Sequence, residues 1–427
     1  MGVPRSRKSV MQKDSRICYS FTILQVLYWA VNALVYTYIG VFLLNKGFTN
    51  HIIGIVLLIS CGGALFLQSI EGAWLDKVKA IQRYQLIVGS AALVFLVSLF
   101  LLKNNSTDWV TLLEVVVLLA LVQTMEPLIN GAGIHLVEQK LPLNYGVARA
   151  CSSTSFAVMS VAFGAIINTS GVRVIKPGIV VSAAVLLISA VDFGIRHNSE
   201  RYKTPANERV RNSKSGSFSD LFCKYSRFCI FIAGMAIVYI PHRVMMNYMY
   251  QIMRNVGGGS ASQGIAIAIA SASEIPTMLL FPRIIKKAGP AKLLWISNLV
   301  FTCKIIMVAI AQSEWLIYIA ALLQMGSYAL YTLASIYYVQ EFLPEEHQAK
   351  GHALIILPAI IGSMVGGYIG GAGIDYLGVK NALMLLSVIS VLGSIVAVRA
   401  MAGRLTVKKQ DADIQEAYSR RSFERND

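Results

Sequence analysis

Long apolar runs restrict the folds open to this sequence more than any other feature. Hydrophobic residues make up 56% of the 427-residue chain and charged residues only 14%. About 20 apolar residues in a helix cross the hydrocarbon core of a bilayer. Hydropathy predicts twelve spans, at residues 18–45, 52–76, 84–102, 109–137, 148–168, 174–195, 228–254, 263–283, 293–312, 315–340, 351–373 and 381–401. We therefore expect an all-α integral membrane protein with twelve transmembrane helices.

Positive charge is distributed unevenly between the loops that join these spans. With both termini inside the cell, 30 of the 38 Lys and Arg residues lie in or beside cytoplasmic segments and 6 lie outside. The other two, Arg243 and Lys304, fall within spans. An excess of Lys and Arg marks the cytoplasmic loops of membrane proteins. We expect a multi-pass protein of the plasma membrane with cytoplasmic termini, and we see no indication of nucleic-acid binding.

The sequence repeats at about half its length. Gly54 begins a run that reaches Lys77, and Gly264 begins one that reaches Lys287, so the offset is 210 residues at both ends. This offset predicts two related halves of six spans each. The predicted division is a cytoplasmic tail at 1–17, an N-terminal half at 18–195, a basic cytoplasmic linker at 196–227, a C-terminal half at 228–401 and a solvated, disordered cytoplasmic tail at 402–427.

One carboxylate interrupts the apolar stretch between residues 264 and 282. A charge at a helix centre costs about 2.5–3.5 kcal/mol even on a lenient insertion scale, so Glu274 is a functional-site candidate by default. Residue counts place Glu274 and Arg243 at the same depth, roughly 16 Å from the outer boundary, with Lys304 near the midplane. We expect Glu274 to pair with at least one of these cations. His242 is predicted as a relay in the same charge network.

Two spans carry polar and aromatic residues on a single helical face. The first span has Gln25, Trp29, Asn32 and Tyr36, and the tenth has Gln324, Ser327, Tyr328, Tyr331, Ser335 and Tyr338. Hydroxyls and rings in alternation suit a polar ring such as a sugar or nucleoside, although contact with a neighbouring helix explains the same pattern. The predicted substrate contacts from these faces and from the seventh span are Trp29, Asn32, Gln324, Tyr328, Tyr331 and Asn247.

The cysteines indicate neither a metal site nor a disulfide framework. All six lie in or beside spans, and none forms a CxxC pair. The sequence also lacks HExxH, GxSxG and P-loop motifs. We expect no metal, no other cofactor and no enzymatic activity.

Four short motifs occur in an order that resembles transporters of the major facilitator superfamily. They are Gly72-x-x-x-Asp76-Lys77, Glu126-Pro-Leu-Ile-Asn130, Tyr145-Gly-x-x-Arg149 and Glu274-Ile-Pro276. Their order and spacing look like the branch of lactose permease and the nucleoside–proton symporters, over almost the whole chain. The resemblance implies two six-helix halves around a central cavity.

The resemblance also implies roles for individual residues. Asp76, with Gly72, would form a gate at the helix ends of one half. Arg149 would contact substrate together with an acid in the fourth span, where Asn130 holds the family position and Glu126 lies one turn earlier. Alternatively, Arg149 would extend to the membrane surface from its helix end. The His and Glu that this branch carries in the tenth span are missing, so any proton coupling would depend on Glu274 and His242.

The predicted function is secondary active transport of a small polar solute, which is an oligosaccharide, a nucleoside or an aromatic acid. Burial raises the pKa of a carboxyl group and a nearby cation lowers it, so substrate binding that alters the pairing can move a proton. We therefore predict proton-coupled symport by alternating access, in a protein that functions as a monomer. The alternatives are an exporter of drugs or metabolites and a membrane sensor that does not transport.

Overall fold

The computed structural model describes the backbone of residues 5–77, 82–197 and 218–423, and the side chains of residues 15–75, 82–197 and 221–401. Within these ranges the chain is helical and contains no strand. The N-terminal half comprises α1 (Arg5–Asn45), α2 (Asn50–Lys77), α3 (Arg83–Lys103), α4 (Trp109–Glu138), α5 (Tyr145–Ser170), η1 (Val172–Val174) and α6 (Ile175–His197). The C-terminal half comprises α7 (Phe218–Lys224), α8 (Ser226–Asn247), α9 (Met249–Asn255), α10 (Ser260–Ala288), α11 (Pro290–Ala309), α12 (Glu314–Leu322), η3 (Leu323–Met325), α13 (Tyr328–Phe342), α14 (Glu345–Leu354) and α15 (Leu357–Phe423).

The helices confirm the predicted number of membrane spans. In the described part of the chain, eleven segments are long and apolar enough to cross a bilayer. The last of them, Glu345–Met401, contains Gly378, whose φ of 76° interrupts the helix. Glycine adopts a positive φ readily because it has no Cβ. This segment therefore supplies two spans, and the total is twelve.

Three of the predicted spans are not continuous helices. The eleventh, predicted at 351–373, is interrupted by the turn at 355–356 between α14 and α15. The seventh divides into α8 and α9 at Tyr248. The tenth, predicted at 315–340, passes through the 3-10 turn Leu323–Met325 before α13 begins. Gly326 follows the turn directly, and glycine has a low helix propensity. Irregular backbone at membrane depth occurs only where protein buries it or where it lines a cavity. The turn therefore indicates that Gln324 lies inside the helix bundle and not against lipid.

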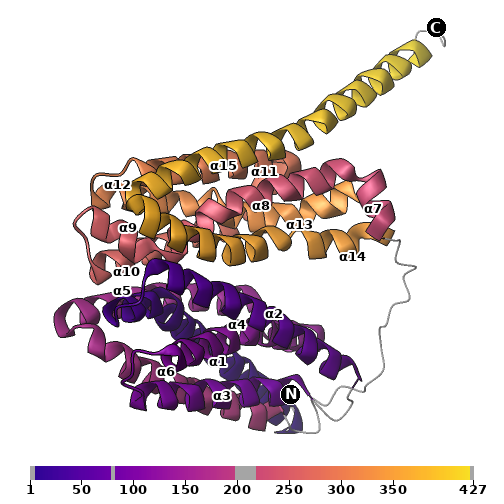
Figure 1. Ribbon diagram of the computed structural model, residues 1–427. Coiled ribbons are helices and arrows are strands. Elements are labelled where there is room, and N and C mark those ends of the chain that lie inside the picture. The colour runs from indigo at the N-terminus through magenta and orange to yellow at the C-terminus, as the bar shows by residue number, and fades with distance from the viewer. Residues whose placement is uncertain (1–4, 78–81, 198–217, 424–427) are drawn as a thin grey trace.

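The two halves stack on each other, with the N-terminal half below and the C-terminal half above in Figure 1. Across the boundary, α2 packs against α15 and α5 packs against α10. The halves lie close together at the left of Figure 1, where α5 meets α10, and diverge toward the right. We call the end where α1 finishes and α2 begins the closed end, and the end where α6 finishes and α7 begins the linker end.

Small residues allow the helices of the two halves to approach closely at the closed end. A Cβ added to Gly264 of α10 would lie 2.7 Å from Tyr38 Oη and 3.0 Å from the carbonyl carbon of Ser160. A Cβ added to Gly371 of α15 would lie 2.8 Å from the carbonyl carbon of Asn50. Small residues at such crossings are typical of packed membrane helices.

Hydrogen bonds also join the halves at the closed end. Asp375 of α15 accepts hydrogen bonds from the backbone N–H groups of Asn50 (3.3 Å) and His51 (2.7 Å), at the start of α2. Gln263 Nε2 of α10 donates to the carbonyl oxygen of Thr37 at 2.7 Å. The other hydrogen bonds between the halves, where both partners are described, also involve the start of α2. The closed end is therefore sealed by direct contacts.

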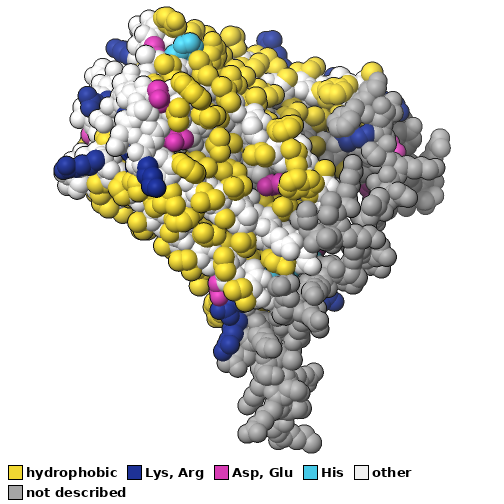
Figure 2. All heavy atoms as spheres, turned by 60° about the horizontal axis from the view of Figure 1, so that its bottom comes forward, with side chains coloured by type: hydrophobic (Ala, Val, Ile, Leu, Met, Phe, Trp, Pro, Cys, Tyr) yellow, Lys and Arg dark blue, Asp and Glu magenta, His cyan; other side chains and the backbone are white. Residues whose placement is uncertain are grey.

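Hydrophobic side chains dominate the surface in Figure 2, and Lys and Arg lie mainly near its margins. Several large apolar side chains are mostly exposed, among them Phe100 (65%), Trp109 (71%), Ile195 (72%) and Leu279 (72%). Soluble monomers rarely expose continuous apolar surface on this scale. Together with the twelve spans, this surface identifies a multi-pass membrane protein.

The predicted tail and linker are covered only in part. Residues 198–217 of the predicted basic linker (196–227) lie outside the described chain. The predicted disorder of the tail is wrong for most of its length, because α15 continues to Phe423. The stretch 408–417 contains Lys, Gln, Glu and Ala, all of which favour helix.

Candidate functional site

Three polar side chains form a hydrogen-bonded chain inside the C-terminal half. Lys304 of α11 is fully buried, and its Nζ donates a hydrogen bond to Oε1 of Gln324 in η3. Nε2 of Gln324 donates to Oε1 of Glu274 in α10 at 3.0 Å. An ammonium group can only donate and an ionised carboxylate can only accept. The amide of Gln324 satisfies both in this orientation, so it links a buried cation to a carboxylate.

This bridge takes the place of the direct ion pair expected for Glu274. Among the described residues, no Lys or Arg nitrogen lies within 4.0 Å of the Glu274 carboxylate. The expected direct pairing is therefore wrong in this conformation. Counting residues gives the depth of a side chain but not the rotation of its helix. In the structure, the amide of Gln324 lies between Lys304 and Glu274. Arg149, Lys304 and Arg243 remain within electrostatic reach of Glu274.

Arg149 extends into the bundle from the first turn of α5. Its Cζ lies 4.4 Å from the centroid of the Trp29 ring, and its Nη1 donates to Ser153 Oγ at 3.3 Å. Ser153 lies one turn further from the linker end, so the side chain points away from the nearby membrane surface. A cation–π contact of this kind contributes about 0.5–2 kcal/mol. The structure favours this inward orientation over an arginine that extends to the surface.

Arg243 approaches the boundary between the halves from α8. Its Nε is buried without a hydrogen-bond partner, and it forms no ion pair with any described residue. The neighbouring His242 packs among aromatic rings, with centroid distances of 5.0 Å to Phe301 and 6.0 Å to Tyr328. The Nδ1 of His242 is also without a partner within the described part of the chain. The relay role of His242 therefore stays a prediction.

Tyr328 lies where charges from both halves converge. Its hydroxyl is within electrostatic reach of Glu126 and Arg149 from the N-terminal half, and of Arg243 and Glu274 from the C-terminal half. Glu126 is itself within reach of both arginines. The Tyr328 hydroxyl has no hydrogen-bond partner in the described chain. We call these five residues the central cluster: the structure brings together side chains that the sequence predicted separately.

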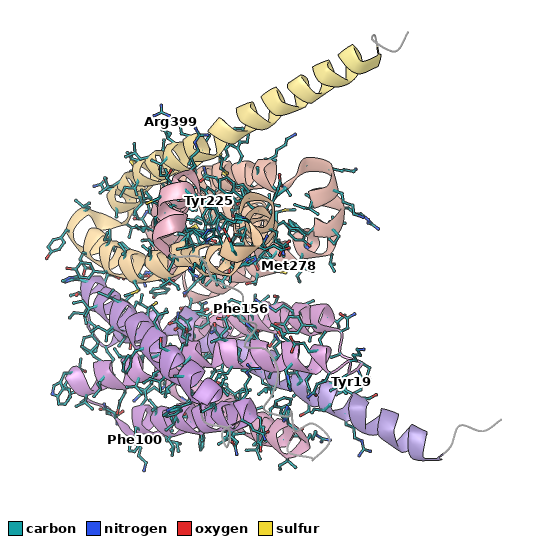
Figure 3. The ribbon with its side chains drawn as sticks, turned by 90° about the vertical axis from the view of Figure 1, so that its right-hand side faces the viewer. Tyr19, Phe100, Phe156, Tyr225, Met278 and Arg399 are labelled. Carbon is teal, nitrogen blue, oxygen red and sulfur yellow. The ribbon has the colours of Figure 1, made fainter. Side chains whose placement is uncertain are left out.

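Figure 3 views the bundle from the linker end and shows the boundary between the two halves. Phe156 of α5 and Met278 of α10, both labelled, lie at the boundary on opposite sides. The Phe156 ring contacts Trp29 edge-on at 6.0 Å between centroids and packs against a hydrophobic cluster of the C-terminal half. The labelled Phe100, in contrast, lies at the outer surface of the lower half. Aromatic surface therefore borders the central cluster.

The remaining predicted substrate contacts differ in how far their polar atoms are already engaged. Asn130 accepts a hydrogen bond at 3.2 Å from a tyrosine hydroxyl at the start of α5. Tyr331 donates at 3.0 Å to a backbone carbonyl between α14 and α15, and Asn32 donates at 3.3 Å to a tyrosine hydroxyl of its own helix. Asn247 is half-buried at the end of α8. Asn130 and Tyr331 thus have structural partners already.

The predicted gate lies at the edge of the described chain. Asp76 is in the last turn of α2, and its side chain lies outside the described residues. Gly72 is exposed, and a Cβ there would meet nothing within 4 Å. The gating role of both residues stays a prediction. The contact of Asp375 with the start of α2 was not predicted from the sequence.

Comparisons with known proteins agree on a transporter fold. Residues 19–385 match the profile of the MFS_1 like family. A protein of Bacillus subtilis (strain 168) called "Uncharacterized transporter YwbF" is 24% identical over 274 residues, which cover 63% of this chain and 65% of that protein, slightly under two thirds of its length. The crystal structure of the nucleoside transporter NupG has a TM-score of 0.70 at 13% identity, covering 90% of this chain and 98% of its own. An inward-facing, unoccupied bacterial homolog of the human lysosomal transporter Spinster has a TM-score of 0.66 at 13% identity, covering 95% and 99%.

Proposed function

This chain belongs to the MFS_1 like family, and we propose that it is a proton-coupled symporter that moves a small polar solute across the plasma membrane. Members of the family and the structural neighbours are membrane transporters, which bind a small molecule as substrate. The proposed solute is an oligosaccharide, a nucleoside or an aromatic acid. NupG, which shares the fold, is a nucleoside transporter.

The unequal ends of the bundle support transport by alternating access. The halves are joined at the closed end, and the hydrogen bonds between described residues include none that joins them at the linker end. If both termini lie in the cytoplasm, the closed end faces outward and this conformation faces inward. The solute would then pass between the central cluster and the cytoplasm. A rocking motion of the two halves would open the central cluster to the outside instead.

The observation that carries the proposal is the Glu274 carboxylate, which lies within a span and has an amide rather than a cation as its hydrogen-bond partner. An ionised carboxylate is costly in a membrane interior, and protonation removes much of that cost. A protonated carboxyl group still offers an acceptor oxygen. Gln324 can therefore donate to Glu274 in both states, so a proton can be taken up without breaking the bridge to Lys304.

The substrate contacts proposed are those that border the boundary between the halves. Arg149, Glu126 and Tyr328 come first, because they belong to the central cluster, together with Trp29, whose ring contacts Arg149. The contacts proposed next are Asn32, Asn130, Asn247, Gln324 and Tyr331. In this proposal both halves belong to one chain, so a monomer is sufficient for transport.

Neutral substitution of the carboxylate tests the coupling. In proteoliposomes with an inward proton gradient, Glu274→Gln should lower accumulation of the solute against its gradient at least 10-fold, while exchange at equal concentrations continues. The matched control is Glu314→Gln, because Glu314 accepts a hydrogen bond from Tyr318 of the same half (2.7 Å) and lies outside the cluster. Full accumulation by Glu274→Gln would overturn the coupling role.

The same vesicles separate the proposal from its alternatives. Uptake driven by an inward proton gradient supports symport, whereas flux in the opposite direction supports an exporter. Binding without flux in either direction would indicate a sensor.

A further inference from the structure

The ionisable groups near the boundary do not balance in charge. Counted in their ordinary charged forms, Arg149, Arg243 and Lys304 carry three positive charges, whereas the described carboxylates that interact with them, Glu126 and Glu274, carry two negative charges. Charges inside a membrane protein are normally compensated by one another. When both carboxylates are ionised, one positive charge therefore lacks a partner among the described side chains of this region.

The atoms without a hydrogen bond next to the cluster are mainly donors. Both Arg243 Nε and Trp29 Nε1 are buried and lack a partner, and neither can accept a hydrogen bond. Two other buried atoms also lack a partner: Gln25 Oε1, an acceptor one turn from Trp29 whose Nε2 is joined to Asn130 (3.4 Å), and His242 Nδ1, which donates or accepts according to its tautomer. A ligand that satisfies the free donors must present acceptor oxygens.

The two arginines belong to opposite halves and interact electrostatically with the same groups. Arg149 comes from α5 of the N-terminal half, and Arg243 comes from α8 of the C-terminal half. Neither lies within 4.0 Å of a carboxylate in the described chain, yet both are within electrostatic reach of Glu126, Glu274 and the Tyr328 hydroxyl. Trp29 already fixes the Arg149 guanidinium from one face. An anion between the arginines would contact both halves at once.

From these contacts we infer that the transported solute is an organic anion with a single carboxylate, bound between Arg149 and Arg243. The inference rests on the proposed transport function and selects the acid among its three solute classes. A guanidinium group matches a carboxylate with two parallel hydrogen bonds, and one carboxylate cancels the extra positive charge. A neutral sugar or nucleoside would leave that charge uncompensated, whereas a phosphate monoester carries about 1.5 to 2 negative charges and would exceed it.

Binding to the purified, full-length protein in detergent at pH 7 tests the inference. The probes are a panel of aromatic and aliphatic monocarboxylates, each paired with its neutral amide, such as 4-hydroxybenzoate with 4-hydroxybenzamide, together with lactose, uridine and phenyl phosphate. Thermal shift, followed by calorimetry on the hits, should find carboxylates that bind at least 10-fold more tightly than their amides. Equal binding of acid and amide, binding of uridine or lactose alone, tighter binding of phenyl phosphate, or no carboxylate that binds would each overturn it.

Variants connect the binding to the two arginines. Arg243→Gln and Arg149→Gln should each weaken carboxylate binding about 10- to 100-fold, because each removes a charged hydrogen bond. Arg243→Lys keeps the charge and should recover part of the affinity. Arg173→Gln is the matched control, since Arg173 is bonded to the carbonyl of Ser170 (3.2 Å) near the closed end. Unchanged affinity in a monodisperse Arg243→Gln protein would contradict the inference.

The binding measurement needs no gradient, so its outcome is independent of proton coupling. A carboxylate that binds and exchanges without any dependence on protons would support the anion site and overturn the symport. A neutral nucleoside that accumulates with protons would support the symport and overturn the anion site.

Discussion

The boundary between the two halves has a different chemistry at its closed end and at its centre. At the closed end, helices touch through glycine, and Asp375 accepts hydrogen bonds from backbone N–H groups of the opposite half. At the centre, side chains with formal charges face each other without direct ion pairs, and the one bridge, between Lys304 and Glu274, stays within the C-terminal half. Among the described residues, hydrogen bonds thus join the two halves at the closed end, whereas no hydrogen bond or ion pair joins them at the centre.

This difference suggests separate roles for the two regions in the alternating access proposed above. Close contacts between small residues are made or lost as a unit, because they require a specific helix distance. Charges at a distance respond gradually to a bound ion or a proton. We therefore expect changes at the closed end to shift the balance between conformations, and changes at the centre to alter which solute or proton is bound.

A bulky side chain at the closed end should have the largest effect. In Gly371→Leu the new side chain would overlap with the carbonyl of Asn50 and with Tyr248, whose Oη would lie 2.6 Å from the added Cβ. Overpacking costs about 1–3 kcal/mol, so the form with a sealed closed end should lose most of its population and transport should fall about 10- to 100-fold. Solute exchange in proteoliposomes measures the loss.

The matched control for this variant is Gly89→Leu in α3. A Cβ at Gly89 would meet nothing within 4 Å, so its leucine should be tolerated in lipid. Hydrogen exchange at residues 50–57 should also increase in Gly371→Leu and not in Gly89→Leu. Normal transport by Gly371→Leu would show that the closed end does not have to seal.

Removing the central bridge should have an intermediate effect. Gln324→Leu leaves Lys304 and Glu274 without their shared amide, so the free energy of unfolding should fall by about 2–3 kcal/mol. Thermal unfolding in detergent measures this loss. The triple variant Gln324→Leu, Lys304→Met, Glu274→Gln should regain part of the stability, because it also removes the two charges.

Gln68→Leu provides the comparison for the bridge. Gln68 donates one hydrogen bond to the carbonyl of Gln123 at 3.2 Å and touches no charged group. Its loss should cost about 1 kcal/mol. Equal destabilisation in Gln324→Leu and Gln68→Leu would mean that the bridge stabilises no more than an ordinary hydrogen bond.

The two regions also differ in how well the sequence predicts them. The spans follow from apolar runs and the flanking charges, both of which are local, so the twelve helices were found with boundaries close to those observed. Glu274, Arg243 and Lys304 were recognised because a charge in an apolar run is conspicuous wherever it points. Their hydrogen-bond partners were not recognised, because the depth of a residue along a helix does not determine how the helix is rotated about its axis. The turn at Leu323–Met325 also changes the direction in which Gln324 points.

The closed end was less predictable, because its hydrogen bonds join residues 198 to 325 positions apart, several of them through backbone groups. The four-residue spacing of Gly362, Gly366 and Gly370 in α15 is typical of close packing, but these glycines meet α8, whereas Gly367 and Gly371 meet α2. Asp375 resembled any acid in a surface turn. No sequence pattern marks an acid that caps a helix of the opposite half.

Asp375 therefore provides the finest test of the comparison, with the smallest expected effect. Asp375→Asn keeps the size of the side chain and one acceptor oxygen but removes the charge that favours the positive N-terminus of α2. The closed end should weaken by about 0.5–1 kcal/mol, seen as a two- to fivefold faster hydrogen exchange at residues 50–54.

Asp108→Asn is the control, because Asp108 caps α4 within its own half. A hydrogen bond from Ser106 and others from backbone N–H groups lower the pKa of Asp108, so this cap is kept at neutral pH and is lost only as the pH falls through that lowered value. The cap across the boundary would be shown not to hold the halves together by either of two results. One is faster hydrogen exchange at residues 50–54 in Asp108→Asn, and the other is an unchanged exchange rate there in Asp375→Asn.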